Sequence, residues 1–312
     1  MVAQAARRRR RTGRAGGGVW YPRWFWPAFA LPGVLWLAVL FVLPLYTVLS
    51  IAFGTIDPLF RNPLPTWNPV QWDTTAVRTV LERTFGDDAY LGPAFLRTFV
   101  YVLCASVLCL VIAYPLSMLI ARSPKKHRDL LVLLVILPFW SNFLIRVYAW
   151  MIILGPQSVF VRALNACIGF FGFEPVSLLF TPFAVIVGLV YVHLPFMVLP
   201  LYANLEKHDP ALLDAAQDLG ANAWQRFWRV TFPLSLPGVY AGAALVFIPA
   251  LGIFAIPDIL GGTEGIMIGN VIKQQFLDTR DWPFGSVLSM VLTVVAVGLA
   301  GLAVWVGRRA RV

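Results

Sequence analysis

Six long apolar stretches constrain the fold of this chain more than any other feature of its sequence. We expect them to form helices at residues 29–53, 95–120, 130–154, 181–203, 237–260 and 284–307. The hydrocarbon core of a bilayer is about 30 Å thick, so a helix needs about 20 apolar residues to cross it. Charged residues make up only 13% of the chain, whereas soluble domains carry about a quarter. The sequence therefore predicts an all-α integral membrane protein with six transmembrane helices.

Prolines lie inside most of these stretches and indicate spans that are kinked or partly unwound. They are Pro32, Pro44, Pro115, Pro138, Pro195, Pro249 and Pro257. In a membrane, the backbone groups that a proline frees must be satisfied by neighbouring helices or by a water-filled cavity. A bundle of such spans suggests a pathway across the membrane more than a simple anchor.

Lysine and arginine residues are concentrated on one side of the predicted bundle. Of the 25 in the chain, 17 lie in the segments 1–28, 121–129, 204–236 and 308–312. The positive-inside rule assigns such segments to the cytoplasm. We therefore expect an N-in, C-in topology, with 1–28 as a cytoplasmic basic tail, 29–307 as the six-span domain and 308–312 as a second cytoplasmic tail.

The segment 204–236 is a long polar segment between the fourth and fifth apolar stretches. Asp209, followed by a proline, is typical of a helix start, because it can cap the first turn while the proline occupies it. Gly220 stands where a residue in the left-handed region would end that helix. Asn222 can cap a second short helix, which we expect to end before Pro233. Two short helices joined by a glycine suggest a docking knob; the alternative is a helix pair lying on lipid headgroups and anchored by tryptophans.

The same segment carries a pattern of spaced residues. Asp214-Ala215-Ala216 is followed by Gly220 and, after nine residues, by Val230-Thr231-Phe232-Pro233. This pattern resembles the cytoplasmic loop of ABC importer permeases, E-A-A-x3-G-x9-I-x-L-P, with Asp for Glu, Val for Ile and Phe for Leu. The resemblance implies a type I ABC importer permease fold, in which 204–236 is the coupling loop to a separate ATPase. The coupling positions it implies are Asp214, Ala215, Ala216, Gly220 and Pro233.

A second resemblance covers most of residues 30–307 and narrows the family. The stretches that carry it are Leu137 to Trp150, Ile256 to Gly262, Met267 to Asn270, Gln275-Phe276 and Asp281 to Gly285. They are similar to the spermidine/putrescine permease subgroup. The resemblance implies a transport subunit of the bacterial inner membrane that forms half of a polyamine pathway. The partners it implies are a second permease subunit, an ABC ATPase dimer, an extracytoplasmic substrate-binding protein and membrane lipid, with no nucleic acid.

The chain itself lacks the sequence signals of a catalytic or cofactor site. No glycine precedes any of the four lysines, so a P-loop cannot be matched, and we expect ATP and Mg²⁺ to bind the partner ATPase. The cysteines and histidines show no metal-type spacing. An importer permease for another solute (an opine, a phosphonate or ferric ion) is an alternative. A secondary transporter is a weaker one, because most spans lack the central acids that ion coupling needs.

The candidate substrate residues are one group of outer carboxylates and aromatic side chains. They are Asp258, Glu264, Tyr148, Trp150 and Trp282. Asp258 is expected at the outer end of the fifth span, where a carboxylate is costly unless it is solvated or paired. Its alternative role is a loop cap or a salt bridge with a protein cation such as Lys273 or Arg280. The aromatic residues can bind alkylammonium groups through cation–π contacts, or they anchor the protein at the membrane interface.

Overall fold

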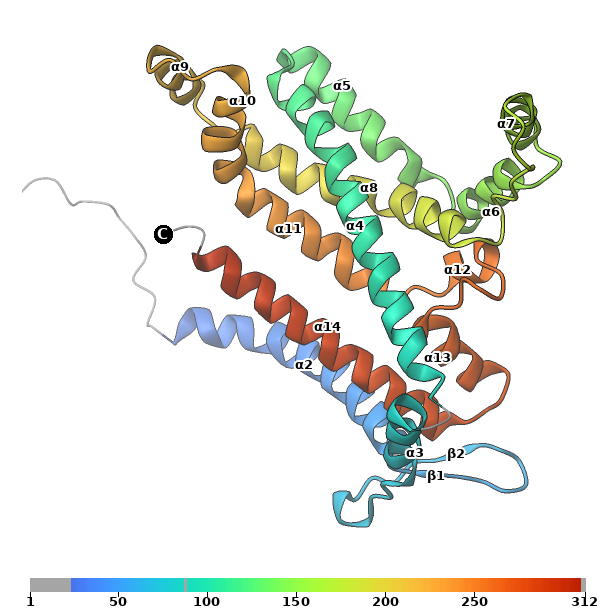
Figure 1. The fold of residues 1–312 in the computed structure, drawn as a ribbon. Helices are drawn as coiled ribbons and strands as arrows, with labels where there is room; N and C mark the ends of the chain where they lie inside the picture. The colour runs from blue at the N-terminus through green and yellow to red at the C-terminus, as the bar shows by residue number, and fades with distance from the viewer. Residues whose placement is uncertain (1–23, 87–88, 310–312) are drawn as a thin grey trace, which may run out of the picture. The chain divides into compact units, whose positions relative to one another are not determined.

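The computed structural model describes residues 24–86 and 89–309 of the 312-residue chain (Figure 1). Its helices are α2 (Phe25–Ala52), α3 (Thr75–Phe85), α4 (Leu91–Arg122), α5 (Lys125–Ile136), α6 (Phe143–Leu154), α7 (Val159–Phe170), α8 (Pro182–Leu205), α9 (Ala211–Asp218), α10 (Ala223–Arg226), α11 (Phe232–Leu251), α12 (Ala255–Leu260), α13 (Ile268–Leu277) and α14 (Trp282–Arg309). Short 3-10 helices η1 (Pro69–Gln71) and η2 (Leu137–Trp140) and a π-helical turn, η3 (Phe227–Thr231), connect some of them. Of the described residues, 24–48 form one unit and those from Leu49 onward form another.

The prediction of six membrane-spanning helices is confirmed. The segments long and apolar enough to cross a bilayer are 25–52, 91–122, 143–170, 182–205, 223–251 and 282–303. Helices α2, α4, α8 and α14 agree with the first, second, fourth and sixth predicted stretches to within a few residues. A two-stranded antiparallel hairpin, β1 (Thr55–Ile56) with β2 (Pro63–Leu64), pairs Thr55 with Leu64 and Ile56 with Pro63.

The predicted third span, a single helix over 130–154, is wrong. The chain forms α5, then η2, and leaves the helix at Ser141 before α6 begins. Proline in the first turn of η2 lacks an N–H, and the side chain of Asn142 accepts a hydrogen bond from the Leu144 N–H at 2.8 Å. Asn142 therefore starts a new helix where hydropathy alone predicts continuity. The candidate span is instead 143–170, which contains α6 and α7 and is interrupted between Leu154 and Val159.

The predicted fifth span, 237–260, is wrong at both ends. Helical structure starts at Ala223 and passes through α10 and η3 into α11, which ends at Leu251 (Figure 1). The turn at Gly252 then separates α11 from the short helix α12. At the start of α11, the Phe232 N–H donates to the Phe227 carbonyl five residues earlier, the bond of a π turn. This turn carries the helix past Pro233, so the proline does not end it.

The centre of the second unit is the packing of α4, α8 and α11 against one another. Two glycines on α11 let its backbone approach α8 closely. A Cβ on Gly238 would lie 2.7 Å from Asn204 Cβ, and one on Gly242 would lie 2.7 Å from the sulfur of Met197. Small residues spaced four apart are a common means of bringing membrane helices together. A buried hydrogen bond between the hydroxyls of Tyr114 and a serine on α11, 2.8 Å long, also joins α4 to α11.

Candidate functional site

Helix α9 begins and ends as its sequence predicts. The side chain of Asp209 accepts a hydrogen bond from the Ala211 N–H at 3.0 Å. At the other end Gly220 has a φ of +81°, in the left-handed region. The Gly220 N–H donates to the Gln217 carbonyl at 2.8 Å, and the Ala221 N–H donates to the carbonyl five residues before it at 3.0 Å. This pair of bonds is a Schellman motif, and it fixes the direction in which the chain leaves α9.

The second half of the loop starts with the cap that its sequence predicts. Asn222 Oδ1 accepts from the Gln225 N–H at 2.8 Å, and Gln225 Oε1 accepts from the Asn222 N–H at 3.0 Å. The reciprocal partner was missed, although Asn-x-x-Gln is readable as a capping box. The expectation that this helix ends before Pro233 is wrong, because α10 and η3 continue into α11. The loop is therefore built partly from the N-terminal end of the fifth span.

The two halves of the loop form a knob, residues 209–232, with an exposed apolar surface. Leu219 is 89% exposed and Trp224 is 69% exposed. A hydrogen bond of 2.6 Å from Arg226 to Gln217 ties α10 to α9. Among the candidate coupling residues, Asp214, Ala215, Gly220 and Pro233 are exposed, and Ala216 is half-buried. Exposed apolar side chains on a folded and braced element are typical of a docking surface.

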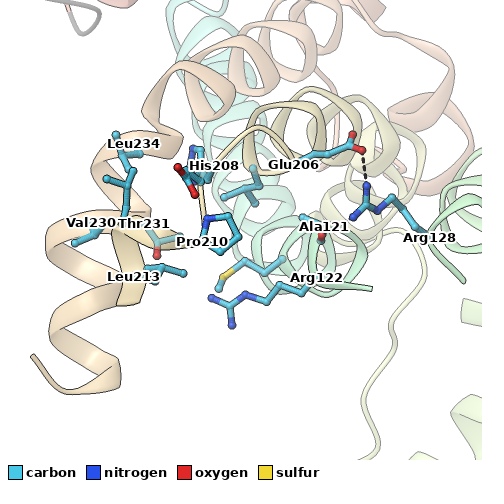
Figure 2. Close-up of a pocket in the computed structure, with 14 residues that line it drawn as sticks. Ala121, Arg122, Arg128, Glu206, His208, Pro210, Leu213, Val230, Thr231 and Leu234 are labelled. Atoms are coloured by element: carbon cyan, nitrogen blue, oxygen red, sulfur yellow. Dashed lines mark hydrogen bonds and ion pairs between the residues drawn. The ribbon is translucent and has the colours of Figure 1, made fainter. Parts of the chain in front are cut away.

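A cavity of about 460 Å³ separates the knob from the ends of α4 and α8. Figure 2 shows Val230 and Thr231 on its η3 side and Ala121 and Arg122 on the opposite side. Glu206, just after α8, forms an ion pair of 2.5 Å with an arginine of α5. The cavity thus lies between the knob and α4, beside the ion pair that connects α5 with the end of α8.

Asp258 is paired with a protein cation, the alternative that the sequence left open. It lies on α12, beyond the turn that ends α11, and not at the end of the fifth span as predicted. Its carboxylate forms an ion pair with Lys273 of α13. Its other oxygen accepts a hydrogen bond of 2.6 Å from Asn270 Nδ2. The hydrogen bond to Asp258 raises the pKa of Lys273, which lies outside the six candidate spans, and the charges of Asp258 and Asp278 add to this effect.

The other candidate substrate residues lie on several elements. Tyr148 and Trp150 belong to α6, against which α12 packs. The ring of Trp150 contacts that of Tyr191 edge-on, with centroids 5.5 Å apart. Trp282 starts α14 and contacts a phenylalanine of α13, with centroids 5.4 Å apart. The backbone carbonyl of Glu264 accepts a hydrogen bond from an arginine of α4 at 2.7 Å. Of the three aromatic candidates, two thus lie on α6, which packs against the helix that carries Asp258.

Two residues of the Asp258 surroundings were missed by sequence reasoning. Asn270 donates both to Asp258 and to the Phe254 carbonyl, the latter at 2.9 Å. The ring centroid of Phe254 lies 6.0 Å from the Lys273 ammonium. The spacing of Asn270 and Lys273 puts them on one face of α13, which is the signal that was available. Within residues 24–86 and 89–309, no three His, Cys, Asp or Glu side chains cluster as metal ligands would.

Comparison with known proteins agrees with this architecture. Residues 113–312 match the family described as the binding-protein-dependent transport system inner membrane component. The chain is 48% identical over 205 residues to the spermidine/putrescine transport system permease protein PotB of Escherichia coli strain K12, covering 65% of this chain and 73% of that protein.

Solved structures show a similar fold. One is a bacterial ABC transporter involved in the import of the acidic polysaccharide alginate, with a TM-score of 0.61, 20% identity, and coverage of 92% of this chain and 96% of that one. Another is a bacterial alginate ABC transporter in complex with an alginate pentasaccharide-bound periplasmic protein, with a TM-score of 0.60, 19% identity, and coverage of 92% and 94%. The chain therefore belongs to the binding-protein-dependent transport system inner membrane components, the multi-pass permease subunits of bacterial ABC importers.

Proposed function

We propose that this chain forms half of the translocation pathway of an ATP-driven polyamine importer, with spermidine and putrescine as the substrate class. The observation that carries the proposal is the 48% identity to PotB, whose name gives those two substrates. The paired carboxylate and ammonium on α12 and α13 support it, because they form a place in this chain where an alkylammonium group is held. Opines, phosphonates and ferric ion remain the alternative substrates.

The partners proposed are those of a complete importer. A second permease subunit would form the other half of the pathway, and a substrate-binding protein would deliver the polyamine. An ABC ATPase dimer would bind ATP and Mg²⁺, for which this chain has no P-loop. The knob, residues 209–232, would dock on that dimer through Leu219 and Trp224, its exposed apolar side chains.

The geometry of the knob gives a route for coupling. When the ATPase subunits close on ATP, the docked knob moves with them. Since α10 and η3 continue directly into α11, that motion is passed to a membrane-spanning helix. Helix α11 packs on α8, α4 and α14, so a tilt of α11 changes the packing at the centre of the bundle. The cavity of about 460 Å³ beside α9 provides space for the movement.

Transport by the reconstituted complex tests this function. The chain would be purified with its second permease and ATPase, placed in liposomes, and supplied with binding protein and labelled spermidine or putrescine. We expect uptake that requires ATP and is blocked by unlabelled polyamines. ATP-driven uptake of another solute with no polyamine uptake would refute the substrate assignment. Polyamine uptake that proceeds without ATP hydrolysis would refute the coupling mechanism.

A further inference from the structure

Three arginines line a cavity of about 670 Å³ at the start of α4. Arg61 lies between the two strands of the hairpin, Arg83 belongs to α3 and Arg97 belongs to α4. The remaining lining residues come from α13 and from the segments on either side of it. Helix α4 begins at this cavity and ends beside the cavity of the knob, so the two cavities lie at opposite ends of a candidate membrane span.

The three guanidinium groups are positioned by neutral partners. Arg61 Nη1 donates to a backbone carbonyl between α13 and α14 at 3.0 Å, and Arg97 Nη1 donates to one between α12 and α13 at 2.7 Å. Arg83 Nη1 donates to the Tyr90 hydroxyl at 3.1 Å, and its guanidinium lies 4.8 Å from the centre of a phenylalanine ring of α14. In the part of the chain that the structure describes, the ion pairs involve none of these arginines. Their charges and further N–H donors therefore suit an anionic ligand.

The cavity carries net positive charge at the edge of the membrane. Among its described lining residues, three arginines against one carboxylate, that of Asp281, leave a net charge of +2. Of the 25 lysines and arginines, 17 lie in the predicted cytoplasmic segments, and three of the other eight line this cavity. Arg97 lies six residues inside a candidate span, where a charge without a counter-ion is costly. Phosphate is a matching anion, because its oxygens accept two parallel hydrogen bonds from one guanidinium.

An apolar stripe on α4 starts beside the cavity and runs along the span. Its members recur at helical spacing and are 42–66% exposed; they are Leu96, Phe99, Val100, Leu103 and Val107. Tyr90 and Trp282, at the starts of α4 and α14, mark the level at which aromatic side chains meet lipid headgroups. A soluble anion would use the cavity alone. A phospholipid would place its phosphate in the cavity and an acyl chain along the stripe.

We propose that Arg61, Arg83 and Arg97, the arginine pocket, bind the phosphate of a phospholipid. In the predicted N-in, C-in topology this lipid belongs to the outer leaflet. An anionic lipid such as phosphatidylglycerol fits better than a zwitterionic one, because it offsets part of the net charge of the pocket. The bound phosphate would connect the hairpin, α3 and α4, the three elements that supply the arginines. The site does not depend on which solute the importer carries.

Thermal unfolding of the purified, delipidated importer complex in neutral detergent tests the site without any substitution. Dioleoyl phosphatidylglycerol should raise the melting temperature. Dioleoylglycerol has the same acyl chains without the phosphate and should have little effect. Millimolar inorganic phosphate should also have little effect, because it cannot contact the stripe. Equal stabilisation by dioleoylglycerol would overturn the role of the phosphate, and equal stabilisation by inorganic phosphate would overturn the lipid as its source.

Substitutions then locate the effect in the arginine pocket. Arg97→Gln should raise the phosphatidylglycerol concentration for half-maximal stabilisation by about tenfold or more, as expected for a lost charge-assisted contact. The triple variant Arg61→Gln/Arg83→Gln/Arg97→Gln should lose the phosphate-dependent part of the shift. Arg78→Gln, on α3 but outside the cavity, is the matched control and should behave as wild type. An unchanged lipid requirement in the triple variant would overturn the proposal. If that variant instead bound the substrate-binding protein more weakly, the pocket would be a docking site for acidic side chains.

Discussion

The bend at Gly220 offers the sharpest test of how the knob works. Its φ of +81° is costly for a residue with a side chain, yet nothing lies within 4 Å of the position that a Cβ would take. The free-energy cost of Gly220→Ala is therefore only that of holding a residue with a side chain in the left-handed region, about 1–2 kcal/mol. A domain with about 5–15 kcal/mol of stability survives this loss, whereas the population of the docking geometry falls about 5- to 30-fold. We expect normal membrane insertion with strongly reduced coupling.

A substitution series separates the backbone effect from a general defect. Asn tolerates the left-handed region better than Ala does, and a β-branched residue tolerates it worst. We therefore expect the wild type to be most active, followed by Gly220→Asn, Gly220→Ala and Gly220→Val. The activities measured are ATP-driven uptake and the ATPase activity that the binding protein stimulates in the reconstituted complex.

The chain contains a matched control for this series. Gly172, after α7, also has a φ of +81° and nothing within 4 Å of its Cβ position. It forms the same pair of backbone bonds, from the Gly172 N–H to the Gly169 carbonyl and from the Phe173 N–H to the Ile168 carbonyl. Gly172→Ala should have the same cost in stability and leave coupling unchanged. Equal loss of coupling in Gly172→Ala and Gly220→Ala would refute the docking role of the bend.

Three further predictions address topology and packing. In a chain without its native cysteines, Glu82→Cys should react with an impermeant thiol reagent in whole cells and Asn222→Cys should not; the reverse pattern would exclude the N-in, C-in topology. Gly242→Ala should lower the thermal stability of the complex by about 1–3 kcal/mol, because its Cβ would overlap α8; unchanged stability would show that the helices can separate freely. A double-mutant cycle on Arg128 and Glu206 should give about 0.2–1 kcal/mol, since the pair is partly solvated; zero coupling would remove it as a link between α5 and α8.

Features set by local interactions could be predicted from the sequence, and those set by long-range contacts could not. The cap at Asp209 and the left-handed Gly220 depend only on neighbouring residues, and both are present. Hydropathy identifies long apolar segments, so it predicted six spans. It does not detect a helix cap, and the cap at Asn142 divides the third stretch. Pro233 suggested a helix end, which the π turn before it prevents.

The pairing of Asp258 lay beyond sequence reasoning for a different reason. Lys273 is 15 residues from Asp258 and lies on another helix. Lys273 and Arg280 were therefore equally consistent with the sequence as partners of this carboxylate. The aromatic candidates were recognisable as a residue type, but only Tyr148 and Trp150 lie on a helix that packs against α12. Membership of the importer permease family excludes the secondary transporter that the sequence left as an alternative.

The helical continuity from Ala223 to Leu251 makes the fifth span a lever arm that starts in the knob. At 1.5 Å per residue, its 29 residues give an arm of about 40 Å. A rotation of about 10° at one end would displace the other by about 7 Å, more than one helical turn. The far end stops three residues before Phe254, whose ring faces the Lys273 ammonium. A movement of the knob at Trp224 would thus be carried to the start of α12 by the backbone itself, and the helix is most easily bent at Pro237 and Pro249.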